Sequence, residues 1–143
     1  MSIKLNYQQT AEILKDLDYV YILTHQSPDG DTIGSGLALY YTLTSMGKKA
    51  KVLCSDSFHH KYDYITKDYV DLEFTPKYIV STDVADTKLL GSLNEPYGDK
   101  VYLCIDHHIS NKEYSKYLLV SPNSSANCEV VYTLFKTMGI KIS

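Results

Sequence analysis

The sequence predicts an α/β domain with three layers, α/β/α, in which a mainly parallel β-sheet lies between helices. Short, nearly continuous apolar runs, typical of buried strands, alternate with segments whose apolar residues recur at helical spacing. With 143 residues, 44% of them hydrophobic, the chain is long enough for one domain with its own core. In such sheets ligands bind outside the carboxyl ends of the strands.

The amino-terminal part is predicted to begin with a helix, a strand and a second helix. Asn6 is a suitable cap for a helix over residues 6–17, which has apolar side chains on one face. The β-rich apolar run at 19–24 predicts a buried strand. Helical spacing of apolar residues predicts a helix over 31–46, and Gly47 suits the position after its end.

The middle of the chain continues this alternation. Strands are expected at 51–54, 78–82 and 101–105 because these runs are short and apolar. The mixed polar stretch 57–69 has room for a helix, and residues 86–93 fit a short one.

The carboxyl-terminal part is predicted to hold a short strand at 116–120 and a helix over 124–138 that Gly139 stops. Residues 1–143 are therefore expected to form a single domain.

Composition excludes several classes of function. The formal net charge is −3, with 14 basic and 17 acidic residues, so the chain lacks the broad basic surface that binds long duplex nucleic acid. No apolar run approaches the length of a membrane span, so no membrane partner is expected. The three cysteines form no CxxC pair, which favours reduced thiols and a cytoplasmic location.

Acidic and histidine side chains follow three of the predicted strands. His25, Asp29 and Asp31 come after the first, and Asp83 directly follows the strand at 78–82. The triplet 106–108, Asp-His-His, follows the strand at 101–105. Because parallel strands end at one edge, these groups are expected to meet there.

A divalent metal centre is the chemistry that such a cluster requires. Clustered carboxylates repel one another unless a cation neutralises them. Gly30 permits a positive φ, so Asp29 and Asp31 on either side of it are expected to address two different cations. Oxygen and imidazole ligands suit Mn²⁺, with Mg²⁺ or Fe²⁺ as alternatives, and paired metals about 3.5–4 Å apart commonly hydrolyse phosphate esters.

Four segments in order resemble the motifs of the DHH phosphoesterase superfamily. The segment from Thr24 to Ser35 looks like the first motif, and Asp83 resembles the aspartate of the second. Residues 106–108, Asp-His-His, match the signature that names the family. Ser124-Ser125-Ala126 with Glu129 resembles the fourth motif, so the similarity covers nearly the whole chain.

The resemblance implies a role for each matched residue. His25 and Asp29 would bind one metal, Asp31 and His107 the second, and Asp83 would bridge them. His108 would face the phosphate, and Asp106 would orient the histidines. Ser35, Ser124 and Ser125 would support or contact the substrate.

The resemblance also implies parts that the chain lacks. Family members carry a further metal-binding aspartate after the fourth motif, and usually a carboxyl-terminal substrate-binding domain. Neither is present before Ser143. The chain is therefore expected to be truncated before that domain, with an incomplete second metal site.

The implied function is hydrolysis, by metal-activated water, of small nucleotides or short oligonucleotides, such as very short RNA or 3′-phosphoadenosine 5′-phosphate. A cyclic-dinucleotide phosphodiesterase, a pyrophosphatase and a non-catalytic module that binds metal or nucleotide remain alternatives. A homodimer is also open. Asp86 is expected to cap a helix, and the pair His59 and His60 is expected to lie on a solvated surface.

Overall fold

The computed structural model describes residues 1–140 of the chain. Within them, six strands form one sheet in the order β1-β6-β5-β4-β2-β3, and every pairing is parallel. The strands are β1 (Ile3–Lys4), β2 (Val20–Leu23), β3 (Ala50–Leu53), β4 (Tyr78–Thr82), β5 (Val101–Asp106) and β6 (Tyr117–Val120). The sequence predicts all of them except β1, whose two residues are too few to show a periodic pattern.

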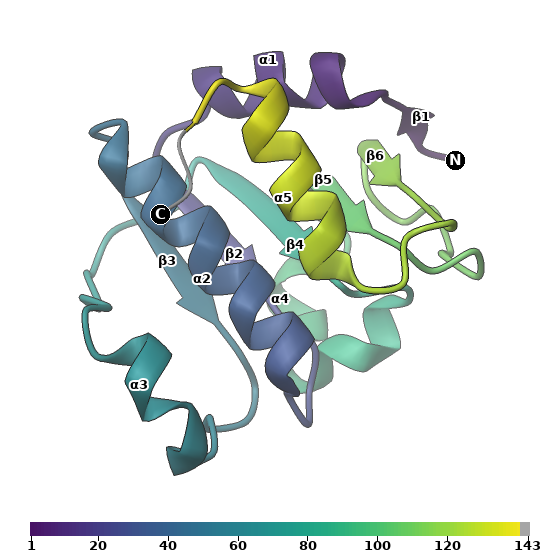
Figure 1. Ribbon diagram of the computed structural model, residues 1–143. Helices are drawn as coiled ribbons and strands as arrows, with labels where there is room; N and C mark the ends of the chain where they lie inside the picture. Colours follow the sequence, from purple (N-terminus) through teal and green to yellow (C-terminus); the bar gives the residue numbers. More distant parts are fainter. Residues whose placement is uncertain (141–143) are drawn as a thin grey trace.

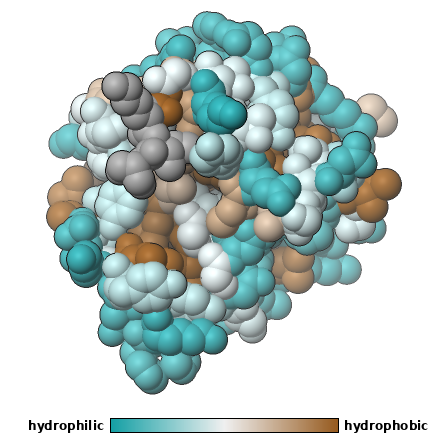
Figure 2. Space-filling view, in the orientation of Figure 1, coloured by the Kyte–Doolittle hydropathy of each residue, from teal (hydrophilic) through white to brown (hydrophobic). Residues whose placement is uncertain are grey.

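Three long helices cover one face of the sheet (Figure 1). They are α1 (Tyr7–Asp16), α2 (Gly30–Ser45) and α5 (Asn127–Thr137). Their apolar sides bury a core with the inward side chains of the strands, including Leu14, Ile22, Leu43, Leu103 and Leu134. Figure 2 shows the outer side of this layer, where hydrophilic residues cover most of the surface and apolar atoms lie in a hollow near its centre.

The opposite face of the sheet has a thinner covering. It consists of the 3₁₀ helix η2 (Thr87–Leu93), the short helix α4 (Asn94–Tyr97) and neighbouring loops. Leu90 and Leu93 from this layer pack with Tyr21 and Ile79 of the sheet. The three-layer α/β/α prediction is therefore confirmed, with layers of unequal depth.

Two of the predicted helical segments are irregular. The stretch 57–69 holds only the 3₁₀ turn η1 (His60–Tyr62) and α3 (Asp63–Thr66). The segment 86–93 is 3₁₀ rather than α, and Gly91 breaks it with a φ of 60° and a ψ of −129°. Asp86 caps it by accepting a hydrogen bond from the backbone N of Lys88, as expected.

The start predicted for the last helix is too early in the sequence. Ser124 belongs to a turn, in which its N–H donates to the carbonyl of Ser121 over 3.1 Å, and α5 begins only at Asn127. The ends of the other helices agree with the sequence. Asn6 caps α1 in a capping box, and Gly47 and Gly139 follow α2 and α5 with positive φ.

The sheet places a crevice between β2 and β4. From β2 the chain passes to α2 on one face, whereas from the adjacent β4 it passes to η2 on the other (Figure 1). The loops after the two strands therefore diverge, which is the arrangement at which open α/β sheets bind ligands.

None of the helices within residues 1–140 has the length and apolar character that crossing a membrane needs. All three cysteines are unpaired.

Candidate metal centre

The loop after β2 holds His25 in a fixed orientation. The Nδ1 of His25 lies 2.7 Å from the carbonyl oxygen of Gln26, so Nδ1 carries the proton and Nε2 is the free ligand atom. The next residues are anchored from outside the loop: the N–H of Gln26 donates to Leu89, and the N–H of Ser27 donates to the carboxylate of Asp56.

The chain reverses at Ser27 and not at Gly30. Ser27 has a φ of 51°, whereas Gly30 is the first residue of α2 and has no positive φ. The expectation of a left-handed Gly30 is thus wrong. Asp29 is the N-cap of α2, because its Oδ1 accepts a hydrogen bond from the N–H of Thr32 over 2.9 Å.

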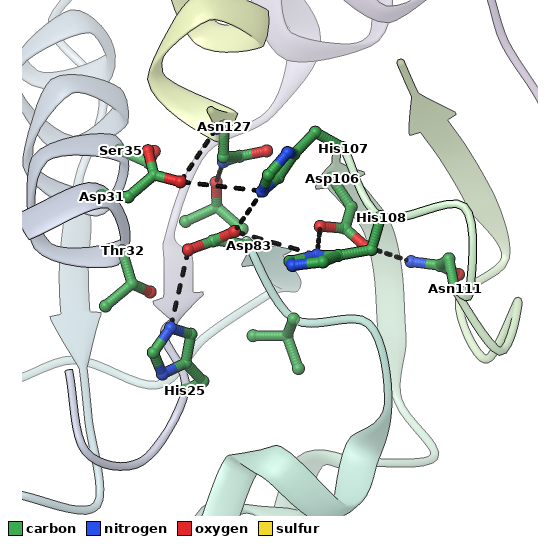
Figure 3. Close-up of polar contacts among 12 residues, drawn as sticks. His25, Asp31, Thr32, Ser35, Asp83, Asp106, His107, His108, Asn111 and Asn127 are labelled. Carbon is green, nitrogen blue, oxygen red and sulfur yellow. Dashed lines mark hydrogen bonds and ion pairs between the residues drawn. The ribbon is translucent and has the colours of Figure 1, made fainter. Parts of the chain in front are cut away.

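Asp83 occupies the centre of the site, directly after β4 (Figure 3). Its φ of 63° lies in the left-handed region, which aspartate tolerates better than most residues. The side chain is buried, with Oδ2 lying 3.5 Å from His25 Nε2 and Oδ1 lying 3.3 Å from His107 Nε2. Each oxygen therefore faces a different imidazole.

The two histidines after β5 are held by their Nδ1 atoms. His107 Nδ1 lies 3.3 Å from the carbonyl oxygen of Ser124, which leaves Nε2 free to face Asp83. His108 Nδ1 lies 2.7 Å from Oδ1 of the fully buried Asp106. The predicted orienting role of Asp106 agrees with this contact to His108, while Ser124 orients His107 through its backbone.

Asp31 reaches across from α2 to the amino end of α5. Its Oδ2 lies 3.8 Å from His107 Nε2, on the side of the site opposite His25 (Figure 3). The same carboxylate accepts hydrogen bonds from the N–H groups of Asn127 and Cys128, each over 2.9 Å. Asp31 therefore has a structural role besides its predicted metal role.

The close packing of these charged groups shifts the pKa values of three of them. The hydrogen bond from His25 to Asp83 raises the pKa of His25 to about 9, although burial acts in the opposite direction. Burial raises the pKa of Asp83, and its bond with His25 offsets part of that effect. Burial also opposes ionisation of Asp31, but the amides of Asn127 and Cys128 outweigh it and hold its pKa below the usual value.

The donor set fits divalent cations. One group comprises His25, Asp29 and Asp83, and a second comprises Asp83, Asp106, His107 and His108, with ligand atoms within 4.8 Å of one another in each. Two atoms that share an ion at about 2.1 Å lie about 3.0–3.4 Å apart, close to the separations around Asp83. Within residues 1–140 no hydrogen-bond partner is found for the buried Asp83 Oδ1, a costly state that a cation would relieve.

These groups open into a cavity of about 540 Å³. It is lined by His25, Gln26, Ser27, Asp29, Asp31, Asp83, Leu89, His107 and His108. All five predicted metal ligands are therefore among its lining residues, together with His108.

The three predicted substrate residues do not line this cavity. Ser35 is fully buried, with its Oγ 3.5 Å from the Sγ of Cys128. Ser124 pairs with the hydroxyl of Ser121, and the hydroxyl of Ser125 donates to Glu129. Their positions suit support of the site rather than side-chain contact with a substrate in the cavity.

Sequence reasoning missed two amide side chains that contact the site. Asn111 donates to Asp106, and the buried Asn127 donates from Nδ2 to the hydroxyl of Thr82 over 2.7 Å. Neither position stands out in the sequence, because an asparagine in a loop or at a helix start is common. The one signal available in the sequence was that Asn111 follows shortly after the Asp-His-His triplet.

With this geometry in place, comparison with known proteins is informative. The family model described as "DHH family, N-terminal domain" matches residues 19–143. The chain belongs to the DHH family. The matched region contains every residue of the metal centre, and the resemblance deduced from the four motifs is confirmed.

Two curated relatives have named activities. The chain is 31% identical over 136 residues to the bifunctional oligoribonuclease and PAP phosphatase NrnA of Thermus thermophilus, covering 92% of this chain and 41% of that protein. It is 26% identical to a probable manganese-dependent inorganic pyrophosphatase of Streptococcus mutans, covering 86% of this chain and 43% of the relative. The chain thus spans about two fifths of the length of these relatives.

Solved structures support the fold. An exopolyphosphatase-related protein from Bacteroides fragilis superposes with a TM-score of 0.82 at 23% identity, covering 93% of this chain and 43% of that one. CDC45 from Entamoeba histolytica superposes with a TM-score of 0.61 at 16% identity, covering 99% of this chain and 31% of that one. Both likenesses show a shared fold and carry no conclusion about activity.

Proposed function

We propose that this domain is the metal-binding part of a phosphoesterase that hydrolyses small nucleotides or short oligonucleotides. The observation that carries the proposal is the placement of Asp83, whose two oxygens face His25 on one side and His107 on the other. This arrangement is the one needed for a carboxylate that bridges two cations.

Each cation would have its own ligands besides the bridge. His25 and Asp29 would hold the first, and Asp31 and His107 the second. Divalent ions bound there lower the pKa of water and neutralise phosphate charge. Mn²⁺ is the metal proposed, because the ligands are carboxylates and imidazoles and because one relative is named as manganese-dependent.

The remaining groups of the chain would act on the phosphate and its leaving group. His108 lies at the cavity with Nδ1 bound to Asp106, so its Nε2 side is available to a phosphate oxygen (Figure 3). An imidazole held in this way can donate a proton or stabilise negative charge. The cavity volume of about 540 Å³ lies within the range of small-molecule sites.

The substrate class is proposed from the relatives together with the geometry. NrnA of Thermus thermophilus is named as an oligoribonuclease and PAP phosphatase, and it shares 31% identity with this chain. A pyrophosphatase and a cyclic-dinucleotide phosphodiesterase would use the same cations. The cytoplasmic location and a homodimeric state stay predictions.

The test is a substrate comparison with the longest natural protein that contains this chain, loaded with Mn²⁺. The substrates are a ribodinucleotide, 3′-phosphoadenosine 5′-phosphate, a cyclic dinucleotide and pyrophosphate. We expect turnover of the first two, and its loss in Asp83→Ala. Metal binding without turnover of any substrate would instead favour a binding module, and full activity in Asp83→Ala would refute the proposal.

A further inference from the structure

Behind the Asp-His-His triplet, a hydrogen-bonded chain of side chains continues from His108 through Asp106 to Asn111, and the proposed function assigns no role to Asn111. Asp106 is fully buried, and both of its carboxylate oxygens are engaged (Figure 3). Oδ1 lies 2.7 Å from His108 Nδ1, and Oδ2 accepts a hydrogen bond from Asn111 Nδ2 over 2.9 Å. Asn111 is thus the second of the two side chains that hold this carboxylate.

The amide of Asn111 is itself fixed in one orientation. Its Oδ1 accepts a hydrogen bond from the backbone N–H of Glu113 over 2.8 Å, and the backbone N–H of Asn111 donates to the carbonyl of His108 over 3.1 Å. Because an amide oxygen cannot donate, the bond from Glu113 requires the NH₂ group to face Asp106. Glu113, with a φ of 54°, bends the loop so that this bond can form.

We propose that Asn111 is a positioning residue for His108 and acts through Asp106. The inference rests on the proposed function, in which His108 serves the phosphate. Asn111 holds the Asp106 carboxylate so that its other oxygen accepts the Nδ1 proton of His108. This bond keeps the imidazole in the Nδ1–H tautomer and directs Nε2 toward the cavity.

The burial of Asp106 is what gives Asn111 this influence. Because Asp106 is fully buried, bulk solvent does not readily replace a donor that its carboxylate loses. Without Asn111 the carboxylate is held by His108 alone, and the geometry of that bond is less constrained. Outer partners of this kind typically contribute about 10- to 100-fold to the function of the groups they orient.

The loop contacts of Asn111 offer a purely structural alternative. Asn111→Asp separates the two, since aspartate can still accept from the N–H of Glu113 but cannot donate to Asp106. Asn6→Ala is the matched control, because it removes the asparagine that caps α1, far along the chain from the triplet. Loss of such a cap lowers the stability of the protein without removing a contact of the triplet.

The experiment compares two substrates in the Mn²⁺-loaded, full-length protein. One is a ribodinucleotide, whose leaving alkoxide needs a proton, and the other is a p-nitrophenyl phosphodiester, whose leaving group departs without one. We expect Asn111→Ala and Asn111→Asp to lower kcat on the dinucleotide about 10-fold or more, with much smaller losses on the nitrophenyl ester. Asn6→Ala should leave kcat unchanged on both substrates. Equal losses on both substrates in the Asn111 variants would overturn the proposal.

A readout that needs no turnover separates this proposal from the proposed function. The ¹⁵N NMR shifts of the His108 ring in the metal-free protein report which nitrogen carries the proton. We expect the Nδ1–H tautomer in the parent protein and an increased Nε2–H fraction in both Asn111 variants. If the parent protein hydrolyses neither substrate, the proposed function fails while these spectra still decide the role of Asn111. An unchanged tautomer in both variants would overturn that role.

Discussion

The carboxylate of Asp31 closes the amino end of a helix that begins 96 residues later, at Asn127. Its Oδ2 accepts the N–H of Asn127, and its Oδ1 accepts the N–H of Cys128, each over 2.9 Å. A helix amino end carries unpaired N–H groups and a partial positive charge, so an anion is stabilising there. The same carboxylate faces His107 across the candidate metal site. The position of α5 and the proposed second cation position therefore depend on one side chain.

Because Asp31 has this double role, its substitution is expected to lower the stability of the protein even when no metal is bound. In Asp31→Asn the charge at the end of α5 disappears, and one of the two acceptors is replaced by a donor. We expect the free energy of unfolding of the metal-free protein to fall by about 1 kcal/mol. Denaturant unfolding in the presence of a chelator measures it.

A matched control uses a surface aspartate. Asp99 is exposed, and no side-chain hydrogen bond of Asp99 is found within residues 1–140, so Asp99→Asn should leave the midpoint unchanged. Equal stability of Asp31→Asn and the parent protein would show that the contact with α5 contributes nothing.

Metal affinity is expected to depend on pH through His25. The pKa of His25 is raised from 6.5 to about 9, so below that pH a proton competes with the cation for Nε2. Mn²⁺ affinity should therefore rise as pH increases from 7 toward 9, with proton release on binding. In the metal-free protein the raised pKa stabilises the fold below pH 6.5, and this contribution is lost as pH rises toward 9. Calorimetry in buffers of different ionisation enthalpy would detect the protons, and a pH-independent affinity would contradict the assignment.

Gly91 is predicted to be needed for the loop that carries His25. A Cβ at this position would lie 2.5 Å from Ser55 Oγ, 3.0 Å from Ser55 Cβ and 3.1 Å from Gln26 Oε1, and its φ is also positive. Gly91→Ala should lower the free energy of unfolding by about 2–3 kcal/mol and weaken Mn²⁺ binding.

Gly47→Ala is the control for the backbone effect alone. Gly47 has a φ of 79°, but a Cβ there meets nothing within 4 Å. A loss of about 1 kcal/mol with unchanged Mn²⁺ affinity is expected. If both variants behave alike in unfolding and in metal titration, the packing of Gly91 against Gln26 is not what supports the loop.

Much of this fold follows from local patterns in the sequence. Apolar runs identify β2 to β6, because a strand covered on both faces needs apolar side chains at nearly every position. The meeting of the candidate metal ligands follows from topology, since parallel strands end at one edge of the sheet. His25, Asp83 and His107 meet there as expected, although they lie far apart along the chain.

Where sequence reasoning failed, contacts between distant segments decide the structure. The start of α5 depends on Asp31 and on the turn before it, so the serines at 124 and 125 could not reveal it. The reversal expected at Gly30 occurs at Ser27, where Asp56 accepts the N–H and stabilises a positive φ. Asn111 was missed because an asparagine in a loop is common, and its contact with the buried Asp106 is seen only in the folded chain.

The central claim, that Asp83 bridges two cations, is tested most directly by anomalous diffraction. Crystals of the protein soaked in Mn²⁺ would be measured at the manganese edge. We expect two peaks, one between His25, Asp29 and Asp83, and one between Asp31, Asp83 and His107, separated by about 3.5–4 Å. Absence of manganese from the contacts of Asp83, in crystals that bind it elsewhere, would contradict the claim.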